Sequence, residues 1–133
     1  MKYCTLSNHM VYRRTKIKTS ELLAANARFV KTLATARLRQ RRKHLISNAN
    51  TNQILALVEI ALNLLRGRVP IRANQKQRLG IHASDIRHLA RVRSDKAARK
   101  VLLRSEQQGS GPFAVASIIS RLVVPFLIDA LSR

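Results

Sequence analysis

Few residues of this chain combine the types and the spacing that catalysis requires. The six acidic residues are scattered, and no two of them are adjacent in the sequence. His82 and His88 can share one face of a helix, but the sequence supplies no further metal ligands beside them. The chain also contains neither a GxxxxGK phosphate loop nor a GxGxxG turn. We therefore expect no catalytic residues, no metal site and no cofactor, and we expect that the protein is not an enzyme.

Basic side chains, by contrast, are abundant enough to bind many phosphate groups. The chain has 26 lysines and arginines against 6 acidic residues, a net charge of +20, and all of this excess lies in residues 1–104. Each basic residue that replaces a counterion on duplex DNA contributes about 0.9 to the slope of log affinity against log salt. We expect nucleic acid as the partner, bound through Arg13, Arg14, Lys16, Lys18, Arg37, Arg39, Arg41, Arg42, Lys43, Arg87, Arg91, Arg93, Lys96, Arg99 and Lys100.

Charge alone does not separate DNA from RNA, but aromatic content bears on the strandedness of the partner. Three Phe, two Tyr and no Trp are too few for a platform on which single-stranded bases stack. Double-stranded DNA, contacted at its phosphates, is therefore the first expectation. A helix-turn-helix reader around residues 84–104 is a weaker alternative, because Gln and Asn are scarce there.

The elements that position these residues form one domain of modest size. The single cysteine, Cys4, cannot form an internal disulfide, and the first residues lack the apolar core of a signal peptide. We expect an all-α fold, a small bundle of short and medium helices with a basic N-terminal arm and an apolar C-terminal helix. The expected divisions are a basic arm (1–19), a basic helical domain (20–104), a linker (105–112) and the apolar helix (113–133).

Helical periodicity begins at Ser20 and continues toward the basic run at residues 37–46. Leu22, Phe29 and Leu33 have helical spacing, and Glu21 suits the first turn of a helix. Asn50 and Gln53 have the spacing of a capping box, and the apolar stripe over 54–65 is the strongest in the chain. This helix is expected to be the central core element or the contact of a homo-oligomer.

Short helical pieces should follow that central helix. Gly67 suits the left-handed residue that ends a helix, and Pro70 prevents continuation. Beyond them, breaks are expected at Gly80 and Ser94, with Ser84 and Ser94 as N-caps.

The last part of the chain changes character at the polar, glycine-containing linker. Beyond it, residues 113–131 are strongly apolar but are interrupted by Arg121, Pro125 and Asp129, so a membrane span is not expected. Three placements remain open: an interfacial helix with Ser117, Ser120 and Arg121 on its polar arc, a helix in a partner's groove, or a last helix packed on the core.

The layout resembles the small basic proteins of Maverick/Polinton-type elements and adintoviruses, which in turn resemble the precursor of adenoviral core protein X. The similarity covers roughly residues 45–131 and rests on ILALVEIALNLLRGRVPIRANQKQRL, the glycine-containing linker and the tail beginning GPF. It implies a virion core protein that condenses packaged viral DNA, located in the virion core and in the host nucleus during infection. This chain departs from the Arg-, His- and Gly-rich adenoviral peptide in having enough Leu, Ile and Val for a helical domain.

The resemblance also implies a viral cysteine protease and capsid proteins as partners. Family cleavage sites have an apolar or amide residue, any residue, Gly, any residue and Gly. Gln107, Gly109, Ser110 and Gly111 fit that form, with the scissile bond after Ser110, where a cut separates the basic part from the apolar tail. Two other classes stay open: a membrane-associated or membrane-active protein anchored through 113–131, and a basic subunit of a ribonucleoprotein.

Overall fold

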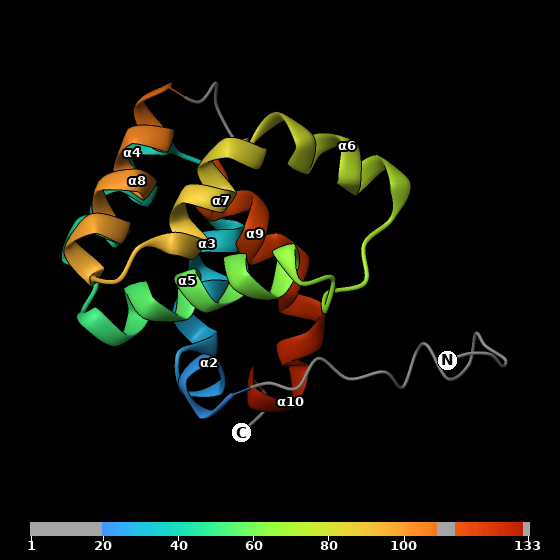
Figure 1. Ribbon diagram of the computed structural model, residues 1–133. Helices are drawn as coiled ribbons and strands as arrows, with labels where there is room; N and C mark the ends of the chain where they lie inside the picture. The colour runs from blue at the N-terminus through green and yellow to red at the C-terminus, as the bar shows by residue number, and fades with distance from the viewer. Residues whose placement is uncertain (1–19, 109–113, 132–133) are drawn as a thin grey trace, which may run out of the picture.

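A computed structural model of the protein describes residues 20–108 and 114–131, and every regular element in these ranges is helical (Figure 1). The all-α class is therefore confirmed, whereas the arm of residues 1–19 lies outside the described residues. In chain order the elements are α2 (Glu21–Ala25), α3 (Ala27–Thr35), α4 (Arg39–Asn48), α5 (Thr51–Leu65), α6 (Ala73–Ile81), α7 (Ala83–Arg91), α8 (Asp95–Gln108), α9 (Val115–Val123), the 3-10 turn η2 (Val124–Leu127) and α10 (Ile128–Leu131).

Helix α5 is the central element that the apolar stripe predicted. The capping box is present: the Asn50 side chain accepts from the backbone N–H of Gln53 at 2.8 Å, and the Gln53 side chain accepts from the N–H of Asn50 at 2.9 Å. Helices α7, α8 and α9 all pack on α5. Its end follows the prediction too, because Gly67 has a φ of +68° directly after the C-cap Arg66, a conformation that glycine adopts without steric cost.

The helix expected from Ser20 onward is interrupted twice. Asn26 has φ −108° and ψ 17°, outside the helical region, and separates α2 from α3. Its side-chain Nδ2 donates to the carbonyl of Leu22 at 2.8 Å, to which its backbone N–H also donates at 3.2 Å. Residues 36–38 then leave the helical path, so the basic run begins a new helix, α4. Continuous periodicity from 20 to 46 was therefore the wrong interpretation of this part of the sequence.

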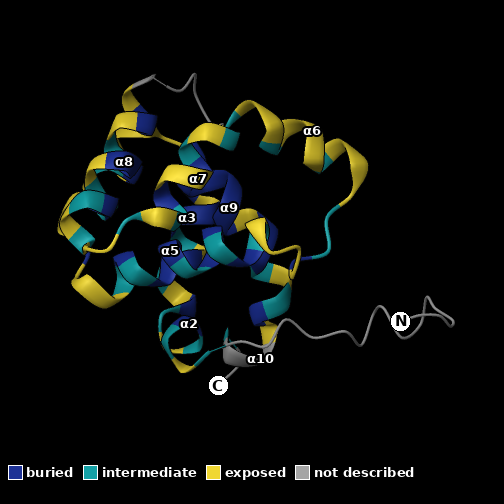
Figure 2. Cartoon of the chain, in the orientation of Figure 1, coloured by how far each residue is buried: buried dark blue, intermediate teal, exposed yellow. Residues whose placement is uncertain are grey.

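The predicted short helical pieces after Pro70 are present, with two of their boundaries shifted. Ser94 caps α8, accepting from the N–H of Ala97 at 3.1 Å. Ser84 is not a cap, because α7 already begins at Ala83 with His82 before it, and Gly80 lies inside α6 and not at a break. Helix α6 stands at one side of the bundle, contains no buried residue and contacts α7 (Figures 1 and 2).

The apolar tail forms part of the core. Residues 114–120 are all buried, as the dark blue of α9 in Figure 2 shows. Helix α9 packs on α3, α5 and α8. The single helix expected over 113–133 is instead divided into α9, η2 and α10, because Pro125 lacks the N–H that a continuing α-helix needs. Ser117 and Ser120 do not form a solvent-facing arc, since both are fully buried.

The boundary between the basic domain and the linker also needs correction. Helix α8 continues through Gln108, so residues 105–108 are helical, and Ser105 and Glu106 are buried. Ser105 Oγ accepts from the N–H of Val115 at 3.1 Å and so joins the end of α8 to the start of α9. The remaining linker residues, 109–112, lie outside the described part of the chain. In that part, no helix has both the length and the apolar character needed to cross a membrane.

Candidate nucleic-acid interface

Three neighbouring helices carry most of the described basic residues that we expected to bind phosphate. Helix α8 packs on α4 and on α7. Helices α4 and α8 run antiparallel, because Arg42 near the start of α4 bonds to Glu106 near the end of α8, while Arg99 near the start of α8 bonds to the carbonyls of Ile46 and Ala49 at the end of α4. Candidates 53 to 61 residues apart in the sequence, at 39–43 and 96–100, are thereby brought onto one pair of helices.

One candidate, Arg42, is not available to a nucleic acid. Its side chain is 0 % exposed, and its Nε donates to both carboxylate oxygens of Glu106 at 3.0 Å. Its Nη1 donates to the carbonyls of Ala36 and Arg37 at 3.1 and 2.8 Å, where α3 ends. Arg42 therefore stabilises the fold, and the assignment of its side chain to phosphate binding is corrected.

Arg99 has a similar structural task. Its Nη1 donates to the carbonyl of Ile46 at 2.6 Å and to that of Ala49 at 2.9 Å, and its Nη2 lies 3.3 Å from Asp95 Oδ2. Cationic donors at the end of a helix satisfy terminal carbonyls and offset the negative end of the helix dipole. Arg99 is half-buried and is held by these bonds, so it positions α4 against α8. Lys96 and Lys100 on the same helix are exposed.

The other described candidates remain at the surface. Lys43 is half-buried, and the remaining ones are exposed, namely Arg37, Arg39, Arg41, Arg87, Arg91, Arg93, Lys96 and Lys100. The arm residues Arg13, Arg14, Lys16 and Lys18 lie outside the described residues, as do Gly109, Ser110 and Gly111 of the cleavage motif. Gln107 of that motif is exposed in the last turn of α8.

Three of the described acidic side chains form bonds with other residues of the bundle. Glu106 pairs with the buried Arg42, and Asp95 pairs with the half-buried Arg99. Both carboxylate oxygens of Glu59 accept from the hydroxyl of Ser20, at 2.7 and 2.6 Å. These three acids thus have partners in the fold, whereas Glu21 is exposed and Asp85 is partly exposed, so the basic side chains greatly outnumber the acids left without such bonds.

Burial is the dominant influence on Glu106 and raises the pKa of this carboxyl above its ordinary value. The hydrogen bond and the charge of Arg42 oppose that effect, as do the more distant charges of Arg39 and Lys43. Arg42 therefore favours the charged form of the carboxyl but does not cancel the effect of burial. Such a pair fixes the relative position of two helices more than it adds to their stability.

Sequence reasoning missed Arg104, which extends the basic surface. Arg104 is exposed, and its Nη2 lies 3.1 Å from Nδ1 of His88 on α7. Lys96, Lys100 and Arg104 follow each other at intervals of four residues and so form one row along α8. That spacing was visible in the sequence, but the contact that joins the row to α7 depends on the packing.

The basic row on α8 is suited to contact with a phosphate backbone. Residues 92–94 join α7 to α8 by a turn as short as that of helix-turn-helix proteins, yet the α8 residues described as exposed are Lys96, Lys100, Arg104 and Gln107. Only one of these four is an amide, the side-chain type that reads adenine edges. Among the described residues, no three His, Cys, Asp or Glu side chains gather as metal ligands.

Fold and surface together define a class, a small all-α protein whose adjacent helices present basic side chains, while Glu106, Asp95 and Glu59 are bonded to other residues of the bundle. Comparison with protein-family models, curated proteins and solved structures finds no match to this chain.

Proposed function

We propose that this protein is a non-sequence-specific DNA-binding core protein that neutralises and condenses packaged viral DNA. The observation that carries the proposal is the separation of charge: exposed Lys and Arg cover α4, α7 and α8, whereas Glu106, Asp95 and Glu59 are bonded within the bundle. Like charges four residues apart, as in the Lys96 row, destabilise an unliganded helix, and an apposed phosphate backbone relieves that repulsion.

The viral context of this proposal is supported by the resemblance carried by the LLRGRVP turn and the layout around it. That turn is where α5 ends at Gly67, so the shared motif includes a position with a defined backbone requirement. A location in the virion core, and in the host nucleus during infection, belongs to the same proposal. So does processing by a viral cysteine protease after Ser110.

In this fold, cleavage after Ser110 is not expected to release the apolar tail. Helix α9 follows the proposed cleavage point and is buried against α3, α5 and α8. We therefore expect that cleavage between 110 and 111 leaves the two fragments bound to each other. Co-elution in native size-exclusion chromatography, with separation in denaturant, is the expected result, and separation without denaturant would favour a removable tail.

The binding proposal is tested by titrating random-sequence duplexes with the full chain at several salt concentrations. Log affinity should fall linearly with log salt and should not depend on sequence. Replacing Lys96 and Lys100 by Ala together should lower the slope by about 1.8, because two phosphate contacts are lost. Arg66→Ala, at an exposed arginine outside the three helices, serves as the matched control.

Two outcomes would overturn the proposal. One is affinity that is insensitive to salt, and the other is sequence-selective binding that survives high salt. Stronger binding to structured RNA than to duplex DNA would move the protein to the ribonucleoprotein class. Binding of anionic vesicles in place of duplex DNA would move it to the membrane-associated class.

A further inference from the structure

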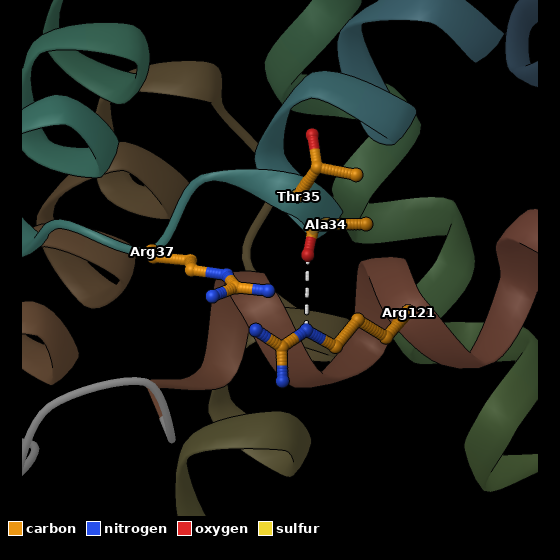
Figure 3. A pocket seen from close by; sticks show the side chains of 4 residues that line it. All are labelled: Ala34, Thr35, Arg37 and Arg121. Carbon is orange, nitrogen blue, oxygen red and sulfur yellow. Dashed lines mark hydrogen bonds between the residues drawn. The ribbon is translucent and has the colours of Figure 1, made fainter.

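A depression with a volume of about 700 Å³ opens where α3 ends, lined by Ala34, Thr35, Arg37 and Arg121. Arg37 lies in the connection between α3 and α4, and Arg121 lies on α9. Figure 3 shows their guanidinium groups pointing toward each other across this space. Two cations from distant parts of the chain thus share one depression, and none of its described lining residues carries a carboxylate.

Arg121 is held in place by the main chain. Its Nε donates to the carbonyl of Ala34 at 2.9 Å, the bond drawn in Figure 3. This bond uses Nε and does not occupy the two Nη groups, which lie on the side of Arg37. The same bond satisfies a carbonyl at the negative end of α3 and so reduces the repulsion between that carbonyl and an anion in the depression.

The backbone of Arg37 is held by a hydrogen bond that does not involve the Arg37 side chain. Its carbonyl accepts from Nη1 of the buried Arg42 at 2.8 Å, which fixes the backbone from which the side chain extends. The guanidinium itself is left at the surface, beside that of Arg121. Guanidinium groups present donors in a fork that matches two oxygens of a phosphate.

We propose that the Arg37–Arg121 depression binds one phosphate group. Two adjacent cations repel each other, and a doubly contacted phosphate removes this repulsion while accepting from both forks. The volume lies in the range of small-ligand clefts and exceeds the size of a lone phosphate, so the group can enter attached to a larger molecule. The source is either the backbone of bound DNA, which rests on the proposed function, or a free phosphate-bearing ligand, which does not.

The test combines a duplex titration with an inorganic phosphate titration of the full chain. The double variant Arg37→Ala with Arg121→Ala should lower the salt slope on duplex DNA by about 0.9, because one phosphate is lost, and each single variant should lower it by less. Two separate contacts would give about 1.8 for the double variant. Arg28→Ala, an exposed arginine of α3 outside the depression, is the matched control.

Inorganic phosphate should shift the NMR signal of Arg121 Nε–H at constant ionic strength, and Arg37→Ala should abolish the shift. Arg37→Ala leaves the carbonyl that Arg42 binds, so it tests the site even if loss of Arg121 weakens the fold. A phosphate-dependent shift with an unchanged duplex slope identifies a free ligand as the source. Absence of the shift, together with a double-variant loss of zero or about 1.8, overturns the proposal. If the native chain shows no salt-dependent DNA binding, the proposed function fails while the phosphate titration still decides the site.

Discussion

Arg42 of α4 and Glu106 of α8 form a fully buried ion pair, in which the arginine Nε donates to both carboxylate oxygens at 3.0 Å. The same arginine binds two carbonyls at the end of α3 through Nη1. One side chain therefore connects three helices. Its neighbour Arg41 is exposed, so two adjacent arginines of one helix have opposite environments.

Arg42→Ala should destabilise the fold strongly. Removing one partner of a buried pair leaves the other charge uncompensated, which costs about 3–5 kcal/mol of unfolding free energy. Arg41→Ala should change that free energy by less than about 0.5 kcal/mol, because the side chain is exposed. Urea unfolding of both variants provides the measurement. Duplex titration should show the reverse contrast, with a lower salt slope for Arg41→Ala, and equal stability losses for the two variants would contradict this assignment.

The raised pKa of Glu106 predicts a specific dependence of stability on pH. Because the folded state holds the proton more tightly than the unfolded state, this residue contributes stability that is present below its ordinary pKa near 4.5 and is lost as the pH rises through the raised value. Glu106→Gln removes the titration. The unfolding free energy of the native chain minus that of Glu106→Gln should therefore decrease from pH 4 upward, measured by urea unfolding. Glu21→Gln, at an exposed acid, is the control, and an increase in the difference would refute the prediction.

Two glycines should respond in opposite directions to the same substitution. Gly67 has a φ of +68°, so Gly67→Ala should lower the unfolding free energy by about 1 kcal/mol. Gly80 lies inside α6, where alanine favours the helix, and Gly80→Ala should raise it by about 0.5–1 kcal/mol. An added Cβ meets nothing within 4 Å at either position, so the backbone conformation alone decides the sign. Thermal unfolding of the two variants measures this, and shifts of the same sign would contradict it.

Two buried serines of α9 should be replaceable with a gain in stability. Among the described residues, the hydroxyls of Ser117 and Ser120 meet no hydrogen-bond partner. Each unsatisfied buried hydroxyl costs at least about 1 kcal/mol, and alanine removes this cost with little change of volume. Ser117→Ala and Ser120→Ala should each raise the unfolding free energy by about 1 kcal/mol. Ser84→Ala, at an exposed serine of α7, should leave it nearly unchanged, and a loss of stability at the buried sites would indicate that the hydroxyls are bonded.

Local signals in the sequence predicted local structure well. The Asn50 capping box, the left-handed Gly67 and the Ser94 cap are each decided within a few residues, and the structure confirms all three. The break at Asn26 was missed, because the apolar spacing continues as a helical pattern on both sides of this residue. Periodicity reports which residues can face a core but not where the backbone leaves the helix.

In the candidate interface, too, some features follow from the sequence and others depend on tertiary packing. Charge and its confinement to residues 1–104 follow from the sequence alone, and so does the all-α class, because they depend on composition and on short-range periodicity. The environment of each arginine does not: Arg41 and Arg42 are adjacent, yet only the packing of α8 against α4 places Glu106 beside one of them. The same holds for Arg121, which meets Arg37 because α9 packs on α3. Residue type sets what a side chain can bind. Contacts between distant segments decide whether that side chain is buried, bonded to a carbonyl or exposed at the surface.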